Sequence, residues 1–476
     1  MSPMNDALIN ATPLGLSLFG LTAYMMTYIQ VVTRPIVFAG NENIATILDK
    51  CPSLQTYFWP TPYCWNAHFQ FVPFILRGLW DKYVAPPFEY VREAVELEDG
   101  EQIHLDWVVS CPEMRICGGV PDDKTCMDAT PILVLHHGAM CDHADLPGQD
   151  YIAPALRRGW YVCVLTRRGH AGLKLTRPKW NFFGCPQELK RATQSILQRR
   201  PAAKLLTTGL SSGCAIVAMT MGLPKEWNDF TAGVGISPGY DISKCMGRFT
   251  TPYKEGLLWK AKDYFLRTNE ELLKHLPGYE ACMNAKDLQE WLDNSYAMAG
   301  CESVEHYYEQ YNPMNHIYRS ETPSLYLNAE NDPLCVVENF LEQNENMRNA
   351  VCSAGAVLTK TGSHCPFYEG LFLSNWAEKV TFEFFDSVLA RERQKLMGIE
   401  EDIADVREEG EAFEEGMKRV MSFTESEELN SVQKVAWYGE IKEEGGGGSN
   451  GSEADDVTAV TSEESASECS SMAAGK

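Results

Sequence analysis

The chain has 476 residues, of which 45% are hydrophobic, which is enough for one large globular domain with appended segments. The formal net charge is −24, and the residues from Glu400 onward carry 21 acidic against 6 basic side chains, so the acidity belongs mainly to the C-terminal end. Because no basic stripe appears along the sequence, we expect no nucleic-acid partner.

Sixteen cysteines are scattered along the chain, and no two of them form a Cys-x-x-Cys pair. Without that spacing, and without histidines at zinc-finger spacing, the sequence predicts no metal site. Several cysteines, such as Cys163 and Cys214, fall inside apolar segments, where a free thiol packs as a small hydrophobic group. We therefore expect reduced thiols in the globular part.

The N-terminal stretch 7–33 contains no charged residue and is long enough to cross a bilayer. A cleavable signal peptide fits poorly, because Asp6 precedes the stretch without any basic residue and no small-x-small site follows. We predict that residues 1–35 form a single-pass membrane anchor, with the endoplasmic reticulum as the candidate membrane. An apolar helix that packs on the domain or lies in the membrane interface is the alternative, because Ser, Thr, Gly and Gln dilute the segment. Arg34 and Lys50 flank only the C-terminal side, which favours a cytosolic body.

Residues 36–88 are rich in aromatic residues and proline, most densely between positions 57 and 65. No helical or strand period fits residues 51–74. We expect the segment to wrap the domain or to shape an apolar entrance rather than to supply catalytic groups.

Residues 89–395 alternate between strand-like and helix-like segments. A β-hairpin is predicted around the turn dipeptide Asp99-Gly100. Apolar strands follow at 132–135, 160–165, 205–208 and 232–237, with helices at 146–158 and 188–199 between them. This alternation predicts an α/β fold with a mostly parallel sheet and helices on both faces.

The stretch 240–311 interrupts the alternation with helix-like sequence rich in Trp, Tyr, Leu and Met, which we interpret as a cap. Strands resume at 324–329 and 356–359, and an amphipathic helix at 376–390 closes the domain. Acidic runs, a four-glycine linker and a Ser/Glu-rich end cannot bury a core, so we expect 396–476 to be an acidic disordered tail.

Gly209-Leu210-Ser211-Ser212-Gly213 joins an apolar strand to a run of small and apolar residues that is typical of a helix start. Strand, sharp turn and helix form the pattern of a nucleophile elbow, in which the central serine has a strained backbone. The two glycines leave room where the strand and the helix approach each other closely. We predict that Ser211 is a nucleophile.

Two later residues complete the set that an acyl-transfer serine enzyme needs. Asp332 and His364 follow the last two predicted strands, so nucleophile, acid and base appear in the order found in α/β-hydrolases. Each lies just past the carboxyl end of a strand, where open α/β sheets have their sites. We predict the triad Ser211, Asp332 and His364, with Ser212 as an alternative nucleophile and Glu330 as an alternative acid.

Backbone N–H groups near the predicted nucleophile would stabilise an oxyanion. The donors expected are the N–H of Ser212, at the helix start, and that of Ala139, in the loop after the 132–135 strand, with Met140 as the alternative to Ala139.

Other polar residues near these loops have expected structural roles. His136 and His137 end the strand before the oxyanion loop, although His137-x-x-x-x-Asp142 also matches a short acyltransferase pattern. Arg167, Arg168 and His170 follow the next strand, and we expect them to anchor their loop rather than to bind substrate.

The chain resembles the YheT-like branch of the α/β-hydrolases, which includes membrane-anchored eukaryotic lipases and medium-chain ester synthases. The matching stretches run in family order from about residue 50 to 385: Cys51-Pro52, Pro60-Thr61-Pro62 with His68, Leu105-Asp106-Trp107, His137-Gly138, Arg168-Gly169, Gly209-x-Ser-x-Gly213, Tyr307-Tyr308, Asn328-Ala329 with Asp332-Pro333, and Gly362-x-His364. The loop 136–149 departs from the family, since it lacks the Gly-Ser pair usual after His-Gly, and Asn331 stands where the family often has a second Asp.

This resemblance implies an esterase or phospholipase acting on acyl lipids without a metal or an organic cofactor, with membrane lipid as its surroundings. We expect a lipase-type serine hydrolase that cleaves short- to medium-chain acyl esters or phospholipids through an acyl-enzyme. Two alternatives stay open. One is an acyltransferase that passes the acyl group to an alcohol, and the other is an inactive hydrolase-fold binding module.

Overall fold

One sheet organises the part of the chain that the structure describes, which is residues 3–111, 116–121, 129–144 and 146–397. In this computed structural model the strands of the sheet are β1 (Ile36–Ala39), β2 (Glu89–Glu96), β3 (Gln102–Cys111), β4 (Ile116–Cys117), β5 (Ile132–His136), β6 (Tyr161–Thr166), β7 (Leu205–Leu210), β8 (Phe230–Ile236), β9 (Ser324–Ala329) and β10 (Ala354–Thr359). A separate small pair consists of β11 (Tyr368–Glu369) and β12 (Ser374–Asn375).

The strand order is β1-β10-β9-β8-β7-β5-β6-β3-β2, with β4 paired to β3. The strands from β10 to β6 in this order are parallel, whereas β1, β3 and β2 run antiparallel to their neighbours. The mostly parallel sheet is thus confirmed. The predicted hairpin is confirmed as well, with β2 and β3 joined through Asp99-Gly100, where Gly100 has a left-handed φ of 79°.

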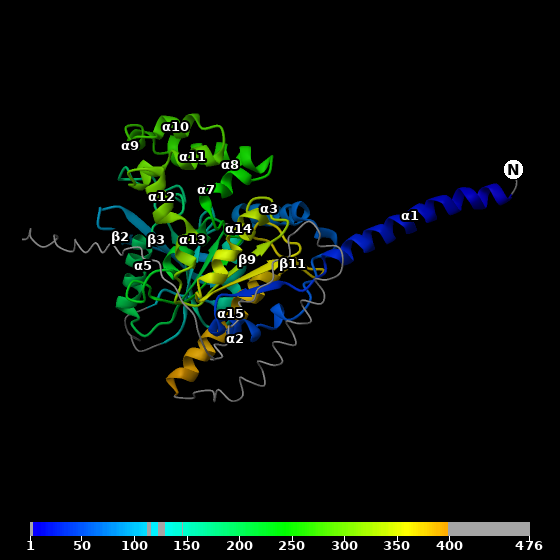
Figure 1. Ribbon diagram of the computed structural model, residues 1–476, viewed down its shortest axis with the longest axis horizontal. Coiled ribbons are helices and arrows are strands. Elements are labelled where there is room, and N and C mark those ends of the chain that lie inside the picture. Colours follow the sequence, from blue (N-terminus) through cyan, green and yellow to red (C-terminus); the bar gives the residue numbers. More distant parts are fainter. Residues whose placement is uncertain (1–2, 112–115, 122–128, 145, 398–476) are drawn as a thin grey trace, which may run out of the picture. The chain divides into compact units, whose positions relative to one another are not determined.

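Different helices cover the two faces of the sheet (Figure 1). On one face α5 (Pro186–Arg199) and α6 (Gly213–Met221) pack in a core that includes Ile132 and Val134 of β5. On the other face α2 (Glu42–Asp49), α4 (Leu146–Arg157) and α15 (Trp376–Leu396) pack with Leu133 and Leu135. The alternation along β5 follows from the two-residue period of a strand, and apolar side chains at every position mark a strand buried on both faces.

The stretch predicted as a cap contains only helices among its described elements, and they lie together at the top of Figure 1. They are α7 (Ile242–Cys245), α8 (Tyr253–Ala261), a π-helical turn at Lys262–Arg267, α9 (Glu270–Leu273), α10 (Tyr279–Asn284), α11 (Leu288–Asp293) and α12 (Val304–Tyr311). The chain returns to the sheet through α13 (Pro313–Ile317), and α14 (Val337–Asn349) joins β9 to β10. The predicted tail 396–476 lies, from residue 398 onward, outside the described residues.

The N-terminal stretch forms one long helix, α1 (Pro3–Val31). Within the described residues, however, no helix is both long enough and apolar enough to span a membrane. The predicted single-pass anchor at 1–35 is therefore not supported. At its C-terminal end α1 is bonded to the following segment: Tyr24 donates to the carbonyl oxygen of Pro62 at 2.6 Å, and Tyr28 donates to that of Pro60 at 2.8 Å.

Residues 36–88 contain regular secondary structure that their sequence pattern does not predict. Besides β1 and α2, they form two short 3-10 turns at Pro52–Leu54 and Pro62–Cys64 and then α3 (Ala67–Tyr83). The helix α3 contains Pro73 and keeps apolar side chains exposed on its outer side, so it lacks the one-sided pattern by which a core-packed helix is recognised.

The backbones of β7 and α6 approach each other very closely. A Cβ atom added at Gly209 would lie 2.3 Å from the carbonyl oxygen of Gly213, and one added at Gly213 would lie 2.5 Å from that of His136. Both obstacles are backbone atoms, which cannot rotate away as a flexible side chain could. The elbow therefore requires glycine at both positions.

We predict that Gly213→Ala lowers the free energy of unfolding by about 2 kcal/mol or more, because the added methyl group overpacks a rigid contact. The measurement is urea unfolding followed by circular dichroism. The matched control is Gly256→Ala in α8, where a Cβ meets no atom within 4 Å and the gain in helix propensity should add about 0.5–1 kcal/mol. Equal stability of the two variants would contradict the close approach.

Candidate active site

Ser211 lies at the turn between β7 and α6. Its φ is 54°, a left-handed value that is rare for a residue with a side chain, and its N–H donates to the carbonyl oxygen of Ile236 in β8 at 2.9 Å. This strained backbone is fixed by the sheet on one side and by the helix on the other. The serine hydroxyl is thereby held at the carboxyl edge of the parallel strands.

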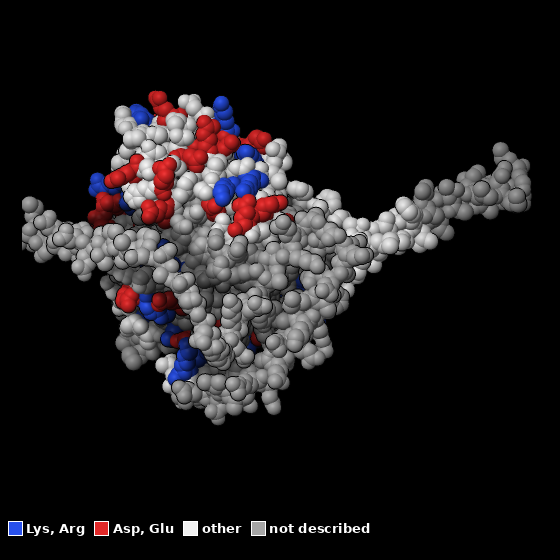
Figure 2. Space-filling view, in the orientation of Figure 1, with Lys and Arg blue, Asp and Glu red and all other residues white. Residues whose placement is uncertain are grey.

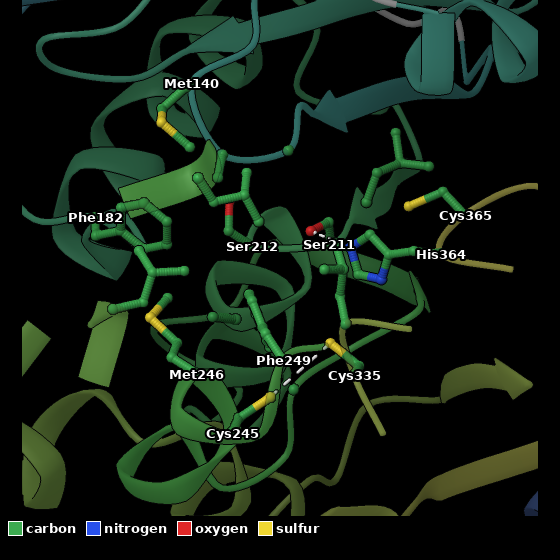
Figure 3. A pocket seen from close by; sticks show the side chains of 18 of the residues that line it. Met140, Phe182, Ser211, Ser212, Cys245, Met246, Phe249, Cys335, His364 and Cys365 are labelled. Carbon is green, nitrogen blue, oxygen red and sulfur yellow. Dashed lines mark hydrogen bonds between the residues drawn. The ribbon is translucent and has the colours of Figure 1, made fainter. Parts of the chain in front are cut away.

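The three residues predicted as a triad lie together, and Figure 3 shows two of them, Ser211 and His364. The Nε2 atom of His364 is 2.6 Å from Oγ of Ser211, and its Nδ1 atom is 2.9 Å and 3.1 Å from the two carboxylate oxygens of Asp332. Asp332 also accepts hydrogen bonds from the backbone N–H groups of Leu334 and Cys335, at 2.8 Å and 3.0 Å. The buried carboxylate is therefore oriented before it meets the imidazole.

The geometry also separates the predicted residues from their alternatives. Glu330 forms an ion pair with Lys360 at 2.7 Å and makes no contact with the imidazole among the hydrogen bonds of the described residues. The Oγ of Ser212 lies 3.5 Å from a nitrogen of Arg167, not at His364. Asp332 and Ser211 are thus the acid and the hydroxyl that face the imidazole.

The two predicted oxyanion donors border the serine from different elements. Ser212 caps the N-terminus of α6, where unpaired backbone N–H groups point outward. Ala139 and Met140 lie in the loop after β5, and both line the same cavity as Ser211. Met140 has a left-handed φ of 56°, so this loop, like the elbow, is held in an uncommon backbone conformation.

An apolar cavity that is partly open to solvent adjoins Ser211 and His364 (Figure 3). Its walls come from α3, the loop before α5, the start of the cap and the oxyanion loop, and they include Phe71, Phe74, Phe182, Phe183, Met246 and Leu257. Such a lining excludes water from one side of the serine and fits a hydrocarbon chain.

Several thiols line the cavity, and the sequence did not single them out. The Sγ atom of Cys245, in α7, lies 4.0 Å from that of Cys335 (Figure 3). Cys141 and Cys365 also line the cavity. The hydrogen bond with Cys245, together with burial, raises the pKa of the Cys335 thiol well above its ordinary value. Nothing in the spacing of sixteen scattered cysteines distinguishes these four, because only the fold assembles them.

Metal-ligating atoms are also close together here. In the described part of the chain Asp332, Cys335 and His364 offer ligand atoms that all lie within 4.8 Å of one another. The carboxylate of Asp332 is bonded to the imidazole of His364, whose other nitrogen is bonded to Ser211, whereas Sγ of Cys335 lies against Sγ of Cys245.

A polar cluster is buried behind the oxyanion loop. Burial and the charge of Arg167 hold the pKa values of His137 and His170 well below the ordinary range, so both rings are neutral. Burial likewise lowers the pKa of His136 to about 3. His137 does not pair with Asp142, whose carboxylate instead forms an ion pair with Lys82 at 3.0 Å, so the short acyltransferase spacing is not a catalytic pair.

No protein-family model matches the chain. Its curated relatives include human phospholipase ABHD3, 25% identical over 390 residues, which cover 77% of this chain and 88% of the relative. They also include human protein ABHD15, 26% identical with 66% and 67% covered, and human monoacylglycerol lipase ABHD2, 23% identical with 74% and 84% covered.

Among solved structures, an esterase from Pyrococcus furiosus is 15% identical with a TM-score of 0.39, covering 64% of this chain and 91% of that one. An acylaminoacyl peptidase from Pyrococcus horikoshii is 12% identical with a TM-score of 0.40, covering 63% and 41%. The YheT-like branch stays a prediction. The mostly parallel sheet and the curated relatives together support placing the chain in the α/β-hydrolase superfamily.

Proposed function

We propose that this protein is a serine hydrolase that cleaves acyl esters of lipids through an acyl-enzyme on Ser211. One observation carries the proposal: the hydroxyl of Ser211 lies 2.6 Å from an imidazole whose other nitrogen is bonded to the buried carboxylate of Asp332. This arrangement fixes the tautomer of His364 so that Nε2 can accept a proton.

The chemistry follows from that geometry. His364 takes the proton of Ser211 as the oxygen attacks the ester carbonyl, and the N–H groups of Ser212 and Ala139 receive the oxyanion. The tetrahedral intermediate expels the alcohol, which receives the proton from His364, and an acyl-enzyme remains. Water activated by the same imidazole then releases the acid. Asp332 stabilises the imidazolium that exists between these steps.

The substrate class is supported by the cavity. Aromatic and aliphatic side chains make up most of its walls, so the acyl chain gains more from entering it than a charged or sugar-like group would. Two of the curated relatives are called a phospholipase and a monoacylglycerol lipase. Short- to medium-chain acyl lipids, including phospholipids, are therefore the substrates we propose.

The acyl-enzyme is also the intermediate of an ester synthase, which differs only in the acceptor. The products formed when water and a medium-chain alcohol compete would separate hydrolysis from transfer. If more of the new ester than of the free acid formed in that competition, the proposed function would change from hydrolase to acyltransferase.

Exposed apolar side chains support the idea that the lipid is reached at a membrane surface. Helix α3, whose Phe71 and Phe74 line the cavity, exposes Val72, Leu76, Leu79 and Trp80 on its outer side. In contrast, the face of the cap seen in Figure 2 carries interspersed acidic and basic side chains, as a surface in water does. We propose that α3 contacts lipid at the entrance of the cavity.

The first prediction concerns the nucleophile. A fluorophosphonate probe should label the wild-type protein and the Ser212→Ala variant, but not the Ser211→Ala variant, because only the Ser211 hydroxyl faces an imidazole. Labelling is read on a gel, and circular dichroism shows that each variant is folded. A folded wild-type protein that takes up no probe would rule out the serine-hydrolase proposal.

The second prediction concerns the acid. Asp332→Asn should lower kcat on a p-nitrophenyl ester roughly 10⁴-fold with little change in KM, because an amide supports the wrong tautomer of His364. The matched control is Glu330→Gln, which removes a partly exposed carboxylate two residues away and should leave kcat nearly unchanged. A larger loss in the control than in Asp332→Asn would assign the acid role to Glu330.

The third prediction concerns the membrane contact. Leu76 and Trp80 are 62% and 58% exposed, so replacing both by Glu should weaken binding to phosphatidylcholine vesicles roughly 100-fold, since each apolar group contributes about 1.5–3 kcal/mol on burial. Turnover of a water-soluble short-chain ester should persist. The control is Trp227→Glu, a tryptophan of similar exposure, 60%, near the opposite end of β8 from the site. Equal loss of binding in the control would show that α3 has no special role.

A further inference from the structure

Arg167 follows β6 directly, and its side chain is buried behind the oxyanion loop. Its Nη2 atom donates to two carbonyl oxygens of that loop, those of His137 at 3.1 Å and Gly138 at 3.2 Å. The same nitrogen lies 3.5 Å from Oγ of Ser212. One guanidinium nitrogen therefore contacts the backbone of the loop that carries Ala139 and the side chain of Ser212, the two residues with the expected oxyanion donors.

The charge of Arg167 has no carboxylate in direct contact among the described residues, and Glu188 acts on it only from a longer distance. In the described part of the chain no carboxylate lies within salt-bridge distance of it, whereas the next residue, Arg168, is paired with Asp99 and Glu188 at 2.8 Å each. Burial lowers the pKa of Arg167 to about 10, so it stays charged at neutral pH. The neutral rings of His137 and His170 face it and offer no negative charge.

We propose that Arg167 is a positioning residue that polarises and holds the oxyanion-binding backbone. The inference rests on the proposed acyl-transfer function. The carbonyl of Gly138 and the N–H of Ala139 belong to one planar amide, so a cationic donor on the oxygen draws electron density from the nitrogen and strengthens its N–H as a donor. A lone positive charge in a buried place also favours the negative charge that develops on the substrate oxygen.

Arg167 acts through the backbone and not on the substrate, because it does not line the cavity. Retaining an unpaired buried charge is costly, since a buried ion without a counter-ion is disfavoured by desolvation. A purely structural role would be filled as well by a paired arginine like Arg168 or by an apolar side chain. The lack of a counter-ion therefore points to an electrostatic role in the reaction.

The experiment compares Arg167→Met with the matched control Arg168→Met on a water-soluble p-nitrophenyl ester. In Arg167→Met we expect kcat and the rate of fluorophosphonate labelling to fall roughly 10- to 100-fold, somewhat less than on loss of a whole oxyanion donor, with KM and Tm nearly unchanged. In Arg168→Met we expect the reverse, a lower Tm from the unpaired Asp99 and Glu188 with kcat per folded molecule nearly unchanged.

Two further variants separate charge from hydrogen bonding and keep the test valid if the methionine variant does not fold. Arg167→Lys keeps the charge and should retain more kcat than Arg167→Gln, which keeps only a neutral donor. Equal kcat in the lysine and glutamine variants, or wild-type kcat in Arg167→Met, would overturn the role of Arg167 alone. A folded wild-type protein that the probe does not label would overturn the proposed function itself, and the positioning role with it.

Discussion

The contact between the start of α6 and the end of β5 is the constraint on which the site depends. A methyl group at Gly213 would collide with the carbonyl oxygens of His136 and His137, so the nucleophile turn and the oxyanion loop are in direct backbone contact. This contact sets the left-handed conformation of Ser211, exposes the N-terminus of α6 and brings Ser212 close to the loop of Ala139. The proposed nucleophile and the proposed oxyanion donors are thus positioned by one packing contact.

The site divides into a polar side and an apolar side with different physical tasks. Behind the oxyanion loop, neutral histidines and the charge of Arg167 form a dry polar cluster that never meets the substrate. In front of it, the cavity is lined by α3 and by the first cap elements. The low dielectric that strengthens the electrostatic interactions of the polar side belongs to the same apolar environment that favours an acyl chain. The proposed catalysis and the proposed substrate preference therefore have one physical origin.

Much of this arrangement is predictable because it depends on local sequence patterns. Apolar runs of strand length between amphipathic helices predicted the parallel sheet, and the elbow with its later acid and histidine identified the three side chains that the structure brings together. For the N-terminal stretch the absence of charge suggested a membrane-spanning segment, which the described part of α1 does not support. The same reasoning missed α3, whose exposed apolar side and internal Pro73 hide a helical period.

By itself the sequence determined which residues to expect as nucleophile, acid and base, in that chain order. A nucleophile elbow needs glycines at fixed positions within five residues, and the acid and the base need only follow later strands. The tertiary structure decided how neighbouring residues of one type differ. Arg168 is neutralised by two carboxylates while Arg167 is left charged and bonded to the oxyanion loop, and Glu330 is paired with a lysine while Asp332 meets the imidazole. These distinctions depend on which distant groups the fold brings within about 3 Å, the range in which a hydrogen bond forms, and adjacent positions in a sequence do not carry that information.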